Sequence, residues 1–345
     1  MNSLKNFKYI LIGFGRMGER YLNLLLKERV KDIFIIEKKK DRINLLTSKF
    51  GINPSKIFKD LSLSQSTHQN KMSKSIAIIA TTADNRLNII KKLSNLNIKY
   101  IFCEKPIARS IKESLGIKKL CKYKNIHLSI NHPRRFSKET KKISDLVKNK
   151  NMGKLISYNF TGANVGIAMV GIHFIEAFLH LTKSKILKVY GNLEKNKFVN
   201  PRGRKFKDYN GCIIGENKNK QKIVINTSEQ AGHGCFVIYT YQRGIIVQDI
   251  IEGKIFINMR KKIYTNEPTY RYALPYDNIS INLKNSELSE ITKTALKKFI
   301  TKKNFITLED SLEALKVVIC SIQSSKLKKE IKIKNINKNL KYNFA

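Results

Sequence analysis

Residues 8–18 read Lys-Tyr-Ile-Leu-Ile-Gly-Phe-Gly-Arg-Met-Gly, and this stretch decides the fold. The run from Tyr9 to Ile12 predicts a buried strand that leads directly into a GxGxxG pattern. Residues 17–29 then place apolar side chains at helical spacing. Strand, glycine turn and helix in this order are the context in which the pattern binds a dinucleotide. The candidate cofactor-binding residues are therefore Gly13, Phe14, Gly15, Arg16, Met17 and Gly18.

Each glycine of the pattern has a separate physical role. Gly13 permits a tight turn, Gly15 lets a pyrophosphate approach the backbone, and Gly18 lets the helix lie close to the strand. The helix N-terminus adds N–H groups and the positive end of the helix dipole. A structural glycine turn that binds no ligand is the alternative interpretation.

An acidic residue supports the dinucleotide interpretation. The apolar run 33–36 ends in Glu37, about 20 residues after the last glycine, where an acid can bind the ribose hydroxyls of NAD. Lys38, Lys39 and Lys40 follow it and can bind a 2′-phosphate. We therefore expect NAD or NADP as the cofactor, with NAD favoured.

The charge of the chain is extreme, because 67 Lys and Arg against 26 Asp and Glu give a formal net charge of +41. A concentrated basic patch would indicate nucleic-acid or anionic-membrane binding. The basic residues are scattered along the chain, and no RNA-binding aromatic motif accompanies them. We attribute the charge to compositional drift and expect no nucleic-acid partner, although anionic small substrates remain compatible with it.

The cysteine pattern is typical of reduced thiols in a cytoplasmic protein. The 345-residue chain has 5 cysteines, widely spaced and without a CxxC pair, so we expect neither a disulfide framework nor a metal site. No apolar run reaches the about 18 residues that a membrane span needs. We also expect no signal peptide, because the glycine turn interrupts the N-terminal apolar run.

Strand and helix patterns alternate through residues 1–130, which predicts a doubly wound parallel sheet, a Rossmann domain. A second domain, 131–345, contains many strand patterns joined by short turns, which predicts an open, mainly antiparallel sheet with helices on one face. The fold class is thus α/β plus α+β. The predicted strands of the first domain are 8–12, 33–36, 76–80, 99–103 and 126–130, and its helices 17–29, 41–49, 84–95 and 110–123. Those of the second are strands 154–161, 187–194, 209–216, 221–227, 235–241, 244–250 and 254–259, and helices 171–181, 287–303 and 307–325. For the segment 327–345 we expect either a last strand or a loose tail.

The fifth predicted strand ends in Glu104-Lys105-Pro106. Proline cannot continue the hydrogen-bond ladder, so the chain turns at the sheet edge where the cofactor is expected. A lysine at this point can hydrogen-bond a substrate hydroxyl and polarise it during hydride transfer. Lys105 is therefore a candidate catalytic residue, and a solvated turn lysine is the alternative.

Six motifs follow one another along the chain: GFGRMG at 13–18, Ala80-Thr81-Thr82, Glu104-Lys105-Pro106, NHPRRF at 131–136, GIHFIE at 171–176 and Thr307-Leu308-Glu309-Asp310. In this order and spacing they make the sequence resemble the Gfo/Idh/MocA family of NAD(P)-dependent oxidoreductases over nearly its whole length. The resemblance implies that Thr81, Glu104, Lys105 and Pro106 line the cofactor site, and that the protein is a homodimer or homotetramer.

The resemblance further implies that His173 transfers the proton, a role for which a side chain that titrates near neutral pH is suited. A histidine packed in the core is the alternative. We take Arg135, Asn164, His173 and Glu176 as candidate substrate contacts, because arginine binds carboxylate or phosphate well and the others surround the histidine motif.

Three positions depart from the family pattern. Met169 stands four residues before His173, where an aspartate is usual, Thr82 replaces a proline, and Arg86 stands where a histidine is common. Met169 removes one acid from the expected catalytic set.

The sequence therefore predicts an oxidoreductase that transfers a hydride between a nicotinamide ring and a secondary alcohol or ketone of a sugar or sugar derivative, with surface-polysaccharide sugars as one setting. An NAD-using epimerase or glycosidase of the same fold and a catalytically impaired dinucleotide-binding sensor or scaffold are the alternatives.

Overall fold

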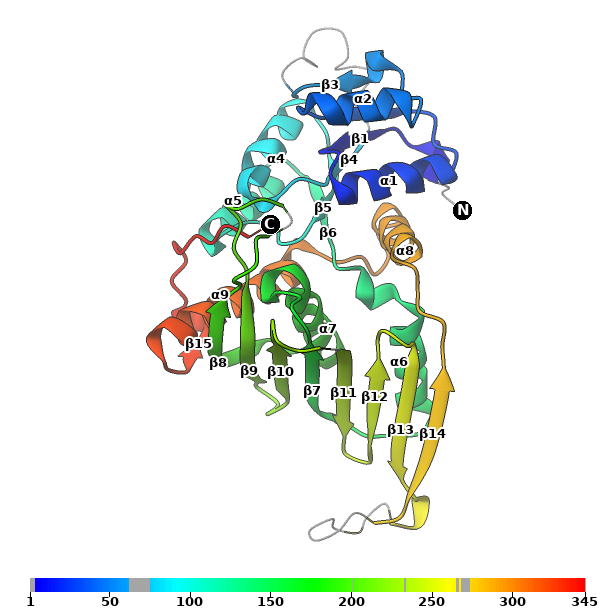
Figure 1. Ribbon diagram of the computed structural model, residues 1–345, viewed down its shortest axis with the longest axis vertical. Coiled ribbons are helices and arrows are strands. Elements are labelled where there is room, and N and C mark those ends of the chain that lie inside the picture. The colour runs from blue at the N-terminus through cyan, green and yellow to red at the C-terminus, as the bar shows by residue number, and fades with distance from the viewer. Residues whose placement is uncertain are drawn as a thin grey trace. The chain divides into compact units, whose positions relative to one another are not determined.

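The computed structural model describes residues 4–61, 75–200, 202–232, 234–264, 267 and 274–344 (Figure 1). The chain forms two compact units. The first comprises Met1–Pro133, Leu288–Leu312 and Lys338–Ala345, and the second Arg134–Glu287 and Glu313–Asn337. This division differs from the expected domains, 1–130 and 131–345, in that two segments after residue 287 join the first unit.

The first unit is built on a six-stranded parallel sheet with the order β3-β2-β1-β4-β5-β6. This is the strand order of a dinucleotide-binding Rossmann fold, which confirms the predicted fold class. β1, β2 and β4 are buried along their whole length, which explains why they read as continuous apolar runs rather than as alternating patterns. The strands are β1 (Tyr9–Ile12), β2 (Ile33–Ile36), β3 (Ile57–Phe58), β4 (Ile76–Ile79), β5 (Tyr100–Glu104) and β6 (His127–Asn131).

Helices connect these strands. α5 begins where the Ser110 hydroxyl accepts a hydrogen bond from the Glu113 N–H at 3.1 Å, a typical N-cap. The last residues of the chain also belong here, since Tyr342 and Phe344 are buried and the Tyr342 N–H donates to the Arg109 carbonyl at 3.0 Å. The helices are α1 (Arg16–Lys27), α2 (Lys40–Ser48), α4 (Arg86–Asn95), α5 (Ile111–Tyr123) and α8 (Leu288–Ile300).

The second unit contains a nine-stranded sheet with the order β14-β13-β12-β11-β7-β10-β9-β8-β15. Its pairs are antiparallel except β7 with β10, so the predicted, mainly antiparallel sheet is confirmed. The strands are β7 (Leu155–Gly162), β8 (Ile186–Lys195), β9 (Tyr209–Asn217), β10 (Lys222–Thr227), β11 (Cys235–Tyr241), β12 (Gly244–Asp249), β13 (Lys254–Arg260), β14 (Tyr276–Asn282) and β15 (Ile331–Lys332). The helices are α6 (Lys138–Asn149), α7 (Ile172–Thr182) and α9 (Leu308–Leu327), of which α9 begins in the first unit.

One face of this sheet carries helices. Phe160 of β7 stacks on Phe174 of α7 with ring centroids 3.7 Å apart. Gly191 of β8 lies so close to α9 that a Cβ there would be 2.2 Å from the Ser321 carbonyl oxygen. The neighbouring positions on the strands point to the opposite face, where large apolar side chains are partly exposed.

Three elements have no counterpart among those that the sequence patterns predict: the helix α6 and the strands β3 and β14. The segment 327–345 contains the short strand β15 and a packed C-terminus rather than a loose tail. Among the described residues, no helix is both long and apolar enough to cross a membrane.

Candidate functional site

The glycine turn lies at the carboxyl end of β1. Gly13 has φ +88°, and a Cβ there would lie 2.8 Å from Thr81 Cγ2. A Cβ on Gly18 would lie 2.1 Å from the Gly13 carbonyl oxygen, so α1 packs directly onto the turn. Gly15 is the N-cap of α1 and has no side-chain cap, and a Cβ there would meet only Arg42 Nη1 at 3.4 Å. The N-terminus of α1 is thus open for a pyrophosphate.

Glu37 ends β2 and turns back to the glycine turn. Its Oε2 accepts from the Phe14 N–H at 2.7 Å, and its Oε1 accepts from the N–H groups of Lys38 at 2.8 Å and Lys39 at 2.9 Å. Arg42 Nη1 lies 3.8 Å from the same carboxylate. A carboxylate has about four acceptor positions, so one remains for a ribose hydroxyl.

Two orphaned polar atoms mark the same edge of the sheet. Thr81 Oγ1 follows β4 and Asn131 Oδ1 ends β6, and both are buried without a hydrogen-bond partner in the described structure. Buried polar atoms rarely remain unpaired unless a ligand or water binds them. The open turn at Gly15, the spare acceptor position of Glu37 and these atoms fit a dinucleotide rich in hydroxyl and amide groups.

Glu104 is locked by a buried network at the ends of β5 and β6. Its Oε1 accepts from the Tyr21 hydroxyl at 2.6 Å and from Asn131 Nδ2 at 2.8 Å. Burial, followed by the neighbouring Glu104 carboxylate, raises the pKa of Tyr21 well above its usual value, so the phenol remains a donor. Lys105 follows directly with 8% of its surface exposed, and its peptide bond to Pro106 is cis. The turn that carries Lys105 is therefore held by side chains from α1 and β6.

His173 lies in the first turn of α7 in the second unit. A π-helical turn, Ile167–Gly171, leads into this helix, and such turns are frequent at functional sites. Asp208 holds the turn, because its carboxylate accepts from the N–H groups of Ala168 at 2.9 Å and Met169 at 2.8 Å. Position 169 therefore has no side-chain carboxylate of its own, but the carboxylate of Asp208 binds its backbone N–H.

Glu176 and Arg135 form a buried ion pair one helical turn after His173. The neighbouring Arg134 guanidinium lies 4.3 Å from the centroid of the Phe174 ring. Burial lowers the pKa of Arg134 from its usual value. Two of the predicted substrate contacts, Arg135 and Glu176, are therefore brought together and neutralise each other.

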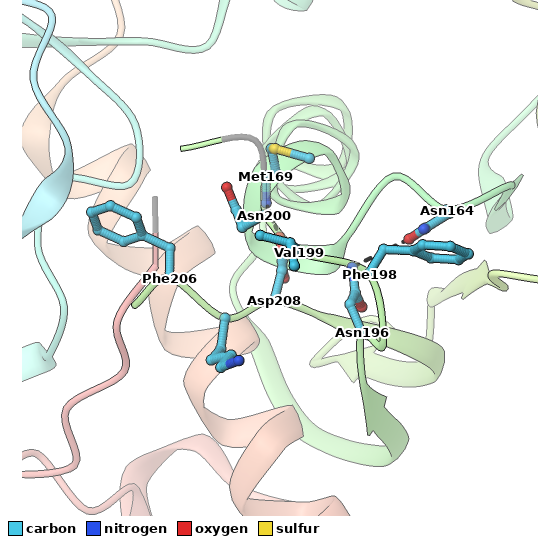
Figure 2. Close-up of a pocket in the computed structure, with 9 residues that line it drawn as sticks. Asn164, Met169, Asn196, Phe198, Val199, Asn200, Phe206 and Asp208 are labelled. Carbon is cyan, nitrogen blue, oxygen red and sulfur yellow. Dashed lines mark hydrogen bonds between the residues drawn. The ribbon is translucent and has the colours of Figure 1, made fainter. Parts of the chain in front are cut away.

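A pocket of about 160 Å³ opens beside Met169 (Figure 2). Asn164 Oδ1 accepts from Asn196 Nδ2 at 3.2 Å and from Asn210 Nδ2 at 2.7 Å. Asn196 Oδ1 is buried and has no hydrogen-bond partner among the residues described. The lining residues are Asn164, Met169, Asn196, Phe198, Val199, Asn200, Phe206, Lys207 and Asp208.

The predicted residues thus form two groups, one in each unit. The first group consists of the glycine turn, Glu37, Thr81 and Lys105. The second consists of His173 and the residues near it. Sequence reasoning missed Asp208, Tyr21 and Asn196, none of which has a local motif, and noted Arg86 only as a departure. In the described part of the chain, no cluster of three His, Cys, Asp or Glu residues is placed to hold a metal.

Comparisons with known proteins agree with this geometry. Residues 7–132 match the Gfo/Idh/MocA oxidoreductase family, described as a NAD-binding Rossmann fold. No curated protein matches the sequence.

Solved structures share the fold over 95% of this chain. An NADPH-dependent oxidoreductase of Desulfitobacterium hafniense is 13% identical with a TM-score of 0.76, covering 95% of this chain and 98% of its own. An Agrobacterium radiobacter oxidoreductase in complex with NAD+, L-tartaric acid and magnesium has the same identity and coverage and a TM-score of 0.73. A super-repressor mutant of Gal80p from Saccharomyces cerevisiae is 12% identical with a TM-score of 0.74, covering 95% and 98%.

The parallel sheet, the open glycine turn and the match over residues 7–132 agree with one another. Residues 7–132 therefore form an NAD-binding Rossmann domain of the Gfo/Idh/MocA oxidoreductase family.

Proposed function

We propose that this oxidoreductase interconverts a secondary alcohol and a ketone on a sugar or sugar derivative, in the cytoplasm, with surface-polysaccharide sugars as one setting. One observation carries the proposal. Lys105 follows β5, which lies between β4 and β6, and the residues at the ends of those two strands, Thr81 and Asn131, have buried polar atoms without a hydrogen-bond partner among the described residues. The bound nicotinamide supplies the hydride acceptor or donor. Everything else in the reaction is proton handling and positioning by the protein.

Lys105 and His173 divide the proton handling in this proposal. The Lys105 ammonium donates a hydrogen bond to the reacting hydroxyl, which makes the hydroxyl more acidic. The His173 imidazole accepts the hydroxyl proton as the ketone forms and returns it in the reverse direction. The two residues lie in different units, so their roles are tested one at a time.

The pocket beside Met169 supports a polyhydroxy substrate. Asn164 and Asn196 present side-chain amides, and Asn196 Oδ1 is an unused buried acceptor. A substrate hydroxyl that donates to this atom gives it a hydrogen-bond partner. Substrates that have this hydroxyl should therefore bind more tightly than analogues that lack it. Phe198, 68% exposed, offers an apolar face for a ring. Arg135 and Glu176 form an ion pair beside His173, and this pair is proposed to bind a substrate oxygen through the Arg135 guanidinium.

Glu37 favours NAD, because its carboxylate repels a 2′-phosphate, whereas Lys38 to Lys40 would attract one. The ligated structure from A. radiobacter contains NAD+, which is consistent with this preference.

The open face of the second sheet is proposed as the contact between subunits of a homodimer or homotetramer. Register places one row of side chains across it, and the row is largely apolar with partly exposed members. An exposed apolar patch of this kind marks a protein–protein contact. The row is Tyr190, Ile214, Val224, Asn159, Ile238, Val247 and Phe256.

The test begins with calorimetric titration of NADH and NADPH, followed by a panel of sugars and sugar acids with spectrophotometric detection at the nicotinamide band. Lys105→Ala and His173→Ala are each expected to lower kcat by about 10²–10⁴-fold, the range of a lost general acid or base. Exposed lysines and histidines serve as matched controls, Lys91→Ala and His127→Ala, and should keep full activity. Turnover that survives both active-site substitutions would refute the assignment.

The second candidate function is a dinucleotide-binding regulator without turnover, which the absence of an acid at Met169 favours. The fold that this chain shares with a super-repressor mutant of Gal80p is consistent with such a role. An epimerase or glycosidase that uses NAD without net oxidation is the third. If nicotinamide cofactor stays bound through purification and sugars are converted without added oxidant, the epimerase or glycosidase is favoured. If the protein binds the cofactor but converts no sugar, the regulator is favoured.

A further inference from the structure

Arg86 is a buried arginine at the start of α4. It is the first residue of that helix and has 2% of its surface exposed, although arginine is among the residues least often buried. Among the described residues, no carboxylate lies within ion-pair distance of its guanidinium. A buried cation without an acidic partner has to be held by hydrogen bonds, so the identity of its acceptors shows what it does.

The acceptors are three backbone carbonyls from two strand ends. Arg86 Nη2 donates to the carbonyl of Thr81, which follows β4, at 2.5 Å. Arg86 Nη1 donates to the carbonyls of Glu104 and Pro106. These two residues are the immediate neighbours of Lys105, one on each side. A single guanidinium nitrogen therefore binds the backbone before and after the candidate catalytic lysine.

No other side chain could replace this arrangement unchanged. Arginine carries five N–H donors in a planar fork, which allows it to bind two separate strand ends at once. Lysine can supply the charge but not the fixed fork, and glutamine supplies only two donors without charge. A histidine has at most two N–H donors, so it could not make all three carbonyl contacts.

We propose that Arg86 is a positioning residue that fixes the backbone on both sides of Lys105 and ties it to the Thr81 strand end, so that the Lys105 ammonium keeps one direction. The proposal rests on the proposed function, because it assumes that Lys105 acts on the substrate. In this role Arg86 acts on the turn that carries Lys105 and not on the substrate. An enzyme gains a large increase in rate by holding a catalytic group in its productive geometry. Losing that geometry is therefore expected to lower kcat more than it lowers the affinity for cofactor or substrate.

The experiment compares Arg86→Lys and Arg86→Gln with the wild type. Both variants are expected to lower kcat by at least tenfold and to raise the Kd for NADH by a smaller factor. Arg86 holds the backbone of Thr81 at the cofactor site, but it makes no hydrogen bond to the glycine turn or to Glu37 among the described residues. Lys91→Gln, an exposed change on the same helix, is the matched control and is expected to leave kcat unchanged.

Hydrogen exchange supplies a readout that does not need turnover. In Arg86→Gln, peptides that cover residues 101–110 are expected to exchange faster, whereas peptides that cover 8–27 are expected to exchange as in the wild type. Equal acceleration in both regions would show a general loss of stability and overturn the positioning role. Should Arg86→Gln fail to fold, the more conservative Arg86→Lys is used for both measurements.

The failures of the two proposals are distinguishable. If the wild type converts no substrate, the proposed function fails, and exchange at 101–110 still tests Arg86. If Lys105→Ala abolishes turnover but both Arg86 variants keep the wild-type kcat, the proposed function stands and the role of Arg86 is wrong.

Discussion

Glu37 Oε2 accepts a hydrogen bond from the Phe14 N–H at 2.7 Å, which joins the acid after β2 to the middle of the glycine turn after β1. Glu37 is thus both a candidate ribose ligand and a structural part of the phosphate-binding turn. The two roles share one carboxylate, so cofactor affinity and turn geometry cannot be changed independently at this position.

Glu37→Gln is expected to weaken NADH binding about tenfold, or ~1.4 kcal/mol. Glutamine has one acceptor oxygen, whereas Glu37 uses both oxygens to bind three N–H groups, so one contact is lost. NADPH should be affected less, because the charge that repels a 2′-phosphate disappears. Calorimetry with both cofactors measures the ratio of Kd values, with the surface change Asp32→Asn as the control; an unchanged ratio would contradict the preference assigned to Glu37.

Gly15→Trp is expected to abolish measurable NADH binding without unfolding the protein. The backbone at Gly15 has φ −85°, which any residue adopts, so the indole can be accommodated but occupies the space above the helix N-terminus. Gly116→Ala is the control, since a Cβ there makes only an ordinary contact with Leu87 at 3.7 Å. Circular dichroism and calorimetry check fold and binding, and retained binding in Gly15→Trp would place the cofactor elsewhere.

Arg135→Met is expected to destabilise the protein by about 3–5 kcal/mol, because it removes the guanidinium that pairs with the buried Glu176 carboxylate. The side chains are 10% and 1% exposed, respectively. The double variant Arg135→Met with Glu176→Met should recover most of the loss. Urea unfolding measures both, and Lys49→Met, which breaks the exposed pair with Glu19, should cost about 0–1 kcal/mol. Equal costs for Arg135→Met and Lys49→Met would mean that Glu176 finds another partner.

Glu139 is expected to make stability depend on acid pH. Burial opposes its ionisation, but hydrogen bonds from Ser286 and Ser137 outweigh burial and hold the pKa of the carboxyl below its usual 4.5. The contribution is therefore fully present above about pH 4.5 and is lost as the pH falls through the lowered value. The free energy of unfolding of the wild type minus that of Glu139→Gln should be constant near neutrality and shrink in acid. A difference that stays constant down to low pH would exclude this linkage.

The sequence predicts the elements whose pattern is local. Four-residue apolar runs define β1, β2 and β4, and Thr307 with Asp310 predicts the start of α9, where Thr307 Oγ1 accepts from the Asp310 N–H at 3.2 Å and Asp310 Oδ2 accepts from the Thr307 N–H at 2.9 Å. The glycine turn belongs to the same class, because tight turns need particular residues at particular positions.

What the sequence does not predict depends on partners far along the chain. β14 is polar and mostly exposed, and only its pairing with β13 makes it a strand. α6 carries four lysines and two acids among few apolar residues, although Ser137 caps it and Ile143 is buried. Asp208 reaches the Met169 N–H across 39 residues, and Arg86 reaches the Pro106 carbonyl across 20. No local spacing encodes such contacts.

The return of residues 288–312 and 338–344 to the first unit has a consequence for synthesis. A ribosome delivers all six strands of the parallel sheet by residue 133, but α8 and the buried Tyr342 and Phe344 come only after the second unit has been made. At about 5–20 residues per second, the delay between residue 133 and residue 338 is about 10–40 s. During this interval the parallel sheet has been synthesised without α8, Tyr342 and Phe344, so the apolar surface that these segments cover in the folded first unit is exposed.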